Sequence, residues 1–150
     1  MKIAFASDHG GLNLKNHLVG YLKKLGYEIL DFGTYSLDSC DYPDYAYKAA
    51  KAVQSEEADR AIVVCTTGIG VSIVCNKVKG VRCCLVSNLE DAKMTRLHND
   101  TNALALGAKN VSYELGEEIC NVWLNTPFSN EERHLRRINK IKEIEEKENE

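Results

Sequence analysis

The segment at residues 60–72, RAIVVCTTGIGVS, joins a continuous apolar run to a glycine-rich turn. The run carries branched apolar residues on both faces, which is typical of a central strand in a parallel sheet that helices cover on each side. Residues 73–78 after the turn continue with a helical pattern. A strand, a glycine turn and a helix in this order predict one unit of an α/β fold, and they place Cys65 at the end of the strand.

The same alternation of short apolar runs and helical patterns fills most of the chain. Strands are predicted at residues 2–7, 27–33, 60–65, 81–86 and 102–107, and helices at 12–25, 45–53, 73–78, 89–97 and 114–124. Right-handed crossovers between such strands give a five-stranded parallel sheet in a doubly wound, Rossmann-like three-layer sandwich. We find no internal repeat, so residues 1–150 are expected to form one domain.

A last, highly charged helix is predicted at about residues 131–147. Its apolar residues form a single stripe, composed of Leu135, Ile138, Ile141 and Ile144. A single stripe needs a surface to cover. Because the five-stranded unit is already complete, we expect this helix to pack on a second subunit, with the parent domain as the alternative.

Composition excludes several classes of function. The net charge of −3 gives no support for a nucleic-acid or membrane-surface binder. No apolar run has the length of a signal-peptide core or a membrane span, so a cytoplasmic protein is expected. None of the six cysteines forms a Cys-x-x-Cys pair, which leaves no indication of a metal site.

Three polar segments, at residues 7–11, 65–72 and 96–102, are expected at one edge of the sheet. Ligands bind outside the carboxyl ends of the strands in open parallel sheets. This expectation singles out a set of polar side chains, namely Asp8, His9, Cys65, Thr66, Thr67, His98 and Asn99.

The glycine turn does not match the common nucleotide motifs. Ile73 stands where a dinucleotide site needs its third glycine, and the Gly-Lys-Ser/Thr of a phosphate-binding loop is absent. The backbone N–H groups that open the following helix suit a small oxyanion, although a purely structural turn is the alternative. Cys65 directly before them is either an inert buried thiol or a thiolate that acts as a base.

Basic residues open the last helix, where the helix dipole favours acidic ones. Arg133 and Arg137 lie one helical turn apart, with His134 and Arg136 between them. A pair of guanidinium groups suits a phosphate, and the alternative is a salt-bridged surface. Together these features indicate a small phosphorylated substrate and acid–base chemistry next to a carbonyl group.

Five motifs resemble the ribose-5-phosphate isomerase B family, a sister of the galactose-6-phosphate isomerase subunits. They are SDHGG (7–11), DFGT (31–34), DYPDYA (41–46), CTTGIGVSIVCNKVKGVR (65–82) and HNDTNALALGAK (98–109). The match runs from residue 1 to about residue 145. The resemblance implies a homodimer, or a tetramer in some members, in which each active site takes residues from both subunits. It also implies that no cofactor or metal is needed.

Carried over by motif, the resemblance implies that Cys65 is the base that moves a proton between C1 and C2 of a sugar phosphate. Thr67 assists transfer between the two oxygens, His98 opens the furanose ring, and Asp8 holds the ring oxygen and hydroxyl groups. The substrate-binding set is Asp8, His9, Tyr42, Thr66, Thr67, Gly68, Ile69, Gly70, Asn99, Lys109, Arg133 and Arg137.

Two residues depart from the pattern of this family. Thr66 replaces a glycine, which is compatible with the loop only if no positive φ is needed there. Lys109 replaces an arginine, which keeps the charge but loses a bidentate phosphate contact. We therefore expect interconversion of D-ribose 5-phosphate and D-ribulose 5-phosphate, with a hexose 6-phosphate isomerase or a non-catalytic sugar-phosphate-binding module as alternatives.

Overall fold

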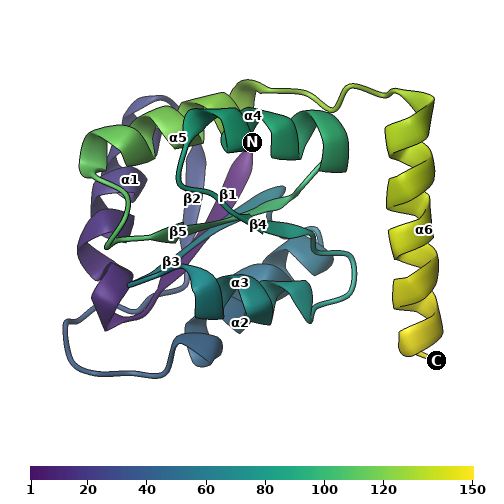
Figure 1. Cartoon of the computed structure of the whole chain (residues 1–150). Helices are drawn as coiled ribbons and strands as arrows, with labels where there is room; N and C mark the ends of the chain where they lie inside the picture. The colour runs from purple at the N-terminus through teal and green to yellow at the C-terminus, as the bar shows by residue number, and fades with distance from the viewer.

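The computed structural model describes all 150 residues and confirms the predicted α/β architecture (Figure 1). The strands are β1 (Lys2–Ser7), β2 (Glu28–Asp31), β3 (Arg60–Cys65), β4 (Cys83–Leu85) and β5 (Ala103–Gly107). The α-helices are α1 (Leu12–Lys24), α2 (Tyr42–Gln54), α3 (Ile69–Asn76), α4 (Leu89–Asn99), α5 (Tyr113–Asn125) and α6 (Glu132–Glu148). A short 3-10 turn, η1 (His9–Gly11), links β1 to α1.

The five strands form one parallel sheet in the order β2-β1-β3-β5-β4, with β3 at its centre. Ala61 at the start of β3 pairs with Ala103, and Cys65 at its end pairs with Gly107. The run that opened the sequence analysis is therefore the central strand, as predicted, and its five residues from Ala61 onward are buried.

The two faces of the sheet differ in the size of their side chains. Large residues such as Phe5, Ile62 and Leu104 face α1, α4 and α5, while alanines face α2 and α3. This division follows from the alternation of side chains along each strand. The alanines of α2 pack with those of the sheet in a cluster of small buried side chains, which otherwise consists of valines and cysteines.

Two helices begin earlier than the sequence predicted. The structure starts α2 at Tyr42, because Pro43 occupies the first turn, where a missing N–H costs no hydrogen bond. It starts α3 at Ile69, so the glycine turn itself opens the helix. Strand β4 is shorter than expected and spans only residues 83–85.

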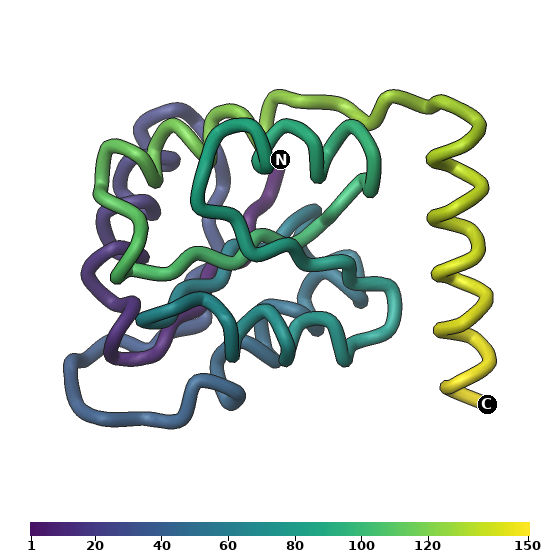
Figure 2. The backbone as a smooth tube through the Cα atoms, viewed as in Figure 1, coloured from purple at the N-terminus to yellow at the C-terminus, as the bar shows by residue number.

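Helix α6 stands at one side of the domain, beside the loop between α3 and β4 (Figures 1 and 2). The His98 and His134 rings stack with centroids 4.3 Å apart, and the Gly80 N–H donates to Glu145 at 2.8 Å. Ile138 is buried, whereas Leu135, Ile141 and Ile144 of the predicted stripe are 45%, 44% and 62% exposed. The parent domain thus covers the stripe only in part.

None of the helices combines the length and apolar character that crossing a bilayer requires.

A buried ion pair anchors the loop after β2. Lys15 of α1 has no exposed surface, and its ammonium group donates to both oxygens of Asp31 at 2.7 and 2.8 Å. It also donates to the Thr34 carbonyl at 2.9 Å. The next residues are held against β1, because the Ser7 N–H donates to the Gly33 carbonyl and the Thr34 N–H donates to the Ser7 carbonyl. The pair therefore fixes the loop beside the end of β1.

We expect Lys15→Met to lower the free energy of unfolding by about 3 kcal/mol, because it leaves the Asp31 carboxylate without its buried partner. Urea denaturation followed by circular dichroism measures this loss. Lys2→Met is the control, because Lys2 and Glu28 form an ion pair with side chains 54% and 62% exposed. Such an exposed pair contributes at most about 1 kcal/mol, so equal losses in both variants would contradict the role given to Lys15.

Candidate active site

The carboxyl ends of β1 and β3 border a cleft of about 400 Å³. It lies where ligands bind in open parallel sheets. Its lining consists of Asp8, Tyr42, Cys65, Thr66, Thr67, Ile69, Gly70 and Ile73. Seven of these eight residues, all except Ile73, belong to the substrate-binding or catalytic set expected from the sequence, so the structure brings one part of that set together.

Cys65 is the only cysteine that lines this cleft. It is the last residue of β3, and its Sγ accepts a hydrogen bond from the Gly68 N–H at 3.1 Å. The sulfur therefore points toward the amide groups that open α3. Cys120 provides a contrast, because complete burial raises the pKa of its thiol to about 12.

The turn between Cys65 and α3 depends on Gly68. Its φ of 78° lies in the left-handed region, and a Cβ there would come within 2.5 Å of Leu85 Cδ1 and 2.8 Å of the Leu106 carbonyl carbon. The turn is also fastened to the end of β5, since Ala108 and Lys109 donate to the carbonyls of Cys65 and Thr66 at 2.9 Å each.

Thr66 occupies this turn without a left-handed backbone conformation. The only non-glycine residues with positive φ are Glu56, Asp100 and Asn130. The condition set by the sequence for a threonine at this position is therefore met. The Thr66 hydroxyl lies over Gly10, where any side chain would collide with it.

The residues after β1 form the second wall of the cleft. Asp8 is buried and accepts the Gly11 N–H at 3.0 Å, which stabilises the η1 turn. His9 accepts the Cys40 N–H on Nδ1 at 3.3 Å. A ring nitrogen that accepts carries no proton, so a neutral His9 holds its proton on Nε2, where it is available to a ligand.

Tyr42 closes the cleft from the first turn of α2. Its ring lies directly on Gly70, where a Cβ would come within 2.5 Å of two ring carbons. The close approach of these residues needs a position without a side chain, which explains the second glycine of the turn. Ile69, Gly70 and Ile73 thus form the α3 side of the cleft.

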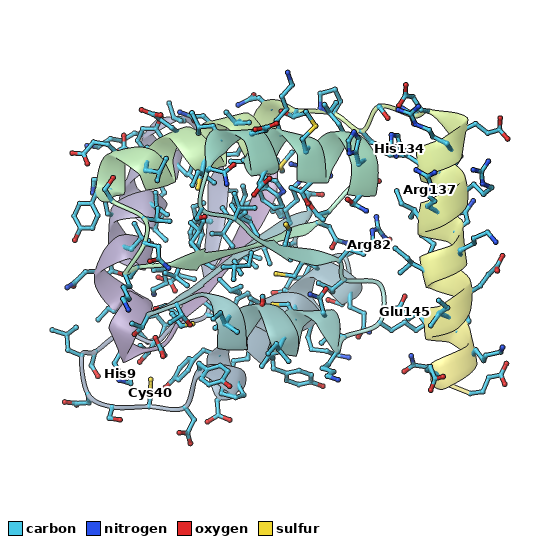
Figure 3. The ribbon with its side chains drawn as sticks, in the orientation of Figure 1. His9, Cys40, Arg82, His134, Arg137 and Glu145 are labelled. Carbon is cyan, nitrogen blue, oxygen red and sulfur yellow. The ribbon has the colours of Figure 1, made fainter.

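A second group of expected site residues lies elsewhere, around the end of α4 and the start of α6. His98 and Asn99 are the last residues of α4, and the His98 ring stacks on His134. Arg133 and Arg137 lie on the same helix as His134. Figure 3 shows His134 and Arg137 on one side of the molecule and His9 with Cys40 on the other.

The sequence predicted that all three polar segments lie at one edge of the sheet. This prediction is wrong for residues 96–102. Helix α4 runs back across the sheet, and β5 starts just after it at Ala103, which pairs with Ala61. Cys65 lies four residues further along β3, roughly 13 Å at the usual rise per residue. His98 and Asn99 thus lie at the amino edge of the sheet, opposite the cleft.

The basic group on α6 is only partly neutralised. Arg133 Nη2 lies 3.3 Å and His134 Nε2 lies 3.1 Å from the same Glu131 carboxylate oxygen. Arg137 is exposed and forms no ion pair within the chain. Burial, together with the charges of His98 and Arg133, lowers the pKa of His134. This surface favours an anion.

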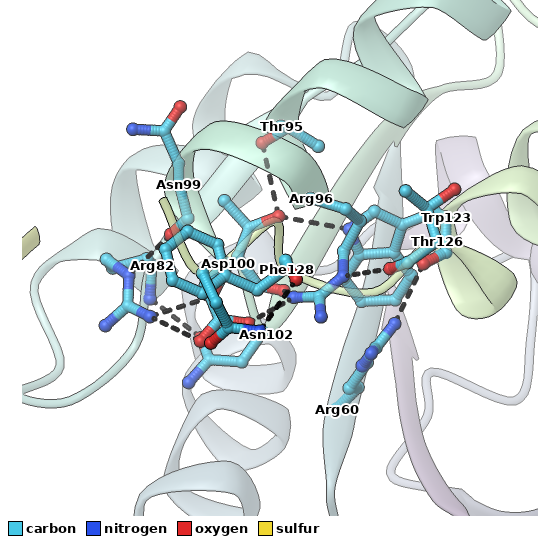
Figure 4. Close-up of polar contacts among 12 residues, drawn as sticks. Arg60, Arg82, Thr95, Arg96, Asn99, Asp100, Asn102, Trp123, Thr126 and Phe128 are labelled. Carbon is cyan, nitrogen blue, oxygen red and sulfur yellow. Dashed lines mark hydrogen bonds and ion pairs between the residues drawn. The ribbon is translucent and has the colours of Figure 1, made fainter. Parts of the chain in front are cut away.

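The end of α4 is held by a network that the sequence analysis did not find (Figure 4). Arg82 and Arg96 donate to backbone carbonyls of residues 99–101. The buried Lys15 was also missed, although its position one residue after Leu14 on an apolar helix face was a usable signal. No group of three or more His, Cys, Asp or Glu side chains converges closely enough to hold a metal ion.

Comparison with known proteins identifies the family of this chain. Residues 3–141 match the profile described as Ribose/Galactose Isomerase. The chain belongs to this family. A ribose-5-phosphate isomerase B from Escherichia coli strain K12 is 42% identical over 148 residues, which cover 99% of each protein.

Solved structures of family members confirm the fold. A ribose-5-phosphate isomerase B from Clostridium thermocellum is 50% identical and superposes with a TM-score of 0.96 over 98% of this chain and 99% of that one. A member from Mycoplasma genitalium, solved with bound ribulose-5-phosphate, is 37% identical, with a TM-score of 0.92 over 97% and 96% of the two chains.

We expect Gly68→Ala to lower the free energy of unfolding by about 3 kcal/mol, because it adds a left-handed backbone penalty to a steric overlap in the turn. Gly80→Ala is the matched control, because Gly80 has a φ of 86° but open space around it. It carries only the backbone penalty, about 1 kcal/mol. Urea denaturation measures both, and equal losses would contradict the close approach of the turn to β5.

Proposed function

We propose that this protein is an aldose–ketose isomerase that interconverts D-ribose 5-phosphate and D-ribulose 5-phosphate. The observation that carries the proposal is the position of Cys65, whose sulfur lies in the cleft and accepts the Gly68 N–H at 3.1 Å. A base beside a set of backbone donors suits proton transfer next to a carbonyl group. The named activities of the relatives agree with this reaction.

The chemistry begins with opening of the furanose ring. The C1–O4 bond breaks, O4 takes a proton, and the anomeric hydroxyl loses its proton as the C1 carbonyl forms. We assign this step to His98, with Asp8 holding the ring oxygen and hydroxyl groups. Asn99 and Tyr42 contact the open sugar.

Isomerisation then moves one proton between carbons and one between oxygens. Cys65 as the thiolate removes the proton from C2 and returns it to C1 through an enediolate. The Thr67 hydroxyl assists transfer from O2 to O1. Backbone N–H groups of residues 66–70 donate to the negative oxygen, which is the form of stabilisation that a preorganised set of amides supplies best.

The phosphate is assigned to the basic residues outside this reaction centre. His9 offers the Nε2 proton, because its Nδ1 is occupied by the Cys40 N–H. Arg137 has no ion-pair partner of its own in the chain, and Arg133 lies one turn before it. Lys109 adds a positive charge just after β5.

The cytoplasmic location expected from the sequence stays a prediction.

We further propose that two copies of the chain form each complete site. Within one chain, the Cys65 cleft and the His98 group lie at opposite edges of the sheet. A two-fold dimer brings a patch of one subunit to a different patch of the other, twice. The half-exposed Leu135, Ile141 and Ile144 of α6 offer an apolar surface for it. Assembly into tetramers stays a prediction from the resemblance.

We expect Cys65→Ala to lower kcat for ribose 5-phosphate by at least about 100-fold, since it removes the base. The measurement is ketose formation, with allose 6-phosphate as a second substrate. The matched control is Cys120→Ala, at a buried thiol far from the cleft lining, which keeps kcat within about twofold. Undiminished turnover by Cys65→Ala would overturn the base assignment. Wild-type turnover of allose 6-phosphate alone would overturn the pentose assignment, and no turnover of either sugar would favour a binding module.

Mixing two inactive variants tests the shared site. In a mixed dimer of Cys65→Ala and His98→Ala subunits, one of the two sites contains both native residues. Random exchange of subunits then restores about a quarter of the wild-type activity. Sites confined to one subunit would give no more than the average of the two separate variants. Light scattering on the same samples reports the mass of the assembly.

A further inference from the structure

The end of α4 is capped by guanidinium groups. The last carbonyls of a helix lack partners within it. Arg82 donates from Nε to the Asn99 carbonyl at 3.0 Å and from Nη2 to the Asp100 carbonyl at 2.7 Å. Arg96 donates from Nη1 to the Thr101 carbonyl at 2.7 Å (Figure 4). The backbone just after His98 is thus held from two sides.

Arg96 also reaches the segment that leads into α6. Its Nε donates to the carbonyl of Thr126, the residue directly after α5, at 3.0 Å. A second bond joins the same two segments, since the Ser129 N–H donates to the Leu97 carbonyl at 3.3 Å. Arg96 therefore connects the helix that carries His98 with the chain that carries Arg133 and Arg137.

The geometry of these bonds depends on the shape of the guanidinium group. Arg96 is only 5% exposed, and its Nη1 lies 2.8 Å from Asp100 Oδ1, which balances the charge. Nε reaches the Thr126 carbonyl while Nη1 reaches Asp100 and Thr101, so two nitrogens fixed in one plane serve the three acceptors, whereas a lysine offers a single nitrogen. A lysine here keeps the charge and loses the geometry.

We propose that Arg96 is a positioning residue of the isomerase, which sets the place of the His98 ring relative to the α6 residues that bind the phosphate. The stacking of His98 on His134, with centroids 4.3 Å apart, is the contact that this position maintains. Arg133 lies beside this pair, with its Nε 3.3 Å from His134 Nε2. The proposal rests on the proposed function, because it takes His98 as the group that opens the sugar ring.

Ring opening is measured separately from isomerisation in a Cys65→Ala background. Without the base, the enzyme still exchanges the two furanose anomers of ribose 5-phosphate through the open chain, and magnetisation-transfer NMR gives the rate. Adding Arg96→Lys is expected to lower this enzyme-dependent rate by at least about tenfold, a part of the usual contribution of an acid–base group. With Cys65 present, the same change lowers kcat more than it changes KM.

Arg60→Lys in the same background is the matched control. Arg60 is a second partly buried arginine nearby, whose Nη1 donates to the Trp123 carbonyl at 2.8 Å and whose side chain lies over the Trp123 ring. It makes no hydrogen bond to the end of α4. We expect its anomer exchange to stay within about twofold of the background. Thermal unfolding of each variant confirms that the folded protein is compared.

Two results would overturn the proposal. One is an unchanged rate of anomer exchange in Arg96→Lys, and the other is an equal loss in Arg60→Lys. If Cys65→Ala alone does not accelerate anomer exchange, His98 does not open the ring and the proposal fails with it. In that case isomerisation by the wild-type protein still supports the proposed function, whereas its absence would contradict the proposed function itself.

Discussion

The close approach between the turn after β3 and the end of β5 determines where Cys65 and the amides that open α3 lie. A Cβ on Gly68 would collide with the backbone of Leu106 and Gly107, and a Cβ on Gly107 would collide with the backbone of Thr67. Two hydrogen bonds from residues 108 and 109 fasten the turn. Because this contact is made by backbone atoms, it leaves little freedom to shift. The Cys65 sulfur and the amides of α3 are consequently preorganised by the fold and not by the side chains around them.

The path of the chain separates the groups that the proposed chemistry needs. A helix that follows a parallel strand must return to the amino edge before the next strand begins, so the last turn of α4 lies far from the cleft. His98 and Asn99 are placed there by topology alone. In the proposed dimer, a second copy of the chain supplies these groups to each cleft, and the exposed part of the α6 stripe is available for the contact.

Much of this arrangement could be predicted from local sequence. Residues 60–65 are apolar on both faces, which placed the central strand correctly, and the glycine turn located the cleft with Cys65 in it. The position of His98 was wrong because a polar segment after a helix was treated like one after a strand. Lys15 was missed because its partner, Asp31, is distant in sequence. The start of α2 was placed too late, at residue 45, because the prediction did not place Pro43 in the first helical turn, where proline is favourable.

The small side chains beneath α2 affect the shape of the cleft. Alanines of the helix, such as Ala46 and Ala50, pack with alanines of the sheet. Because these side chains are small, α2 lies close to the sheet. Tyr42 lies in the first turn of that helix, so its distance from the sheet depends on the same small side chains. The width of the opening over Cys65 therefore depends on core residues that do not line the cleft. A single added methylene in that layer raises the tyrosine ring and widens the entrance without changing any residue that lines it.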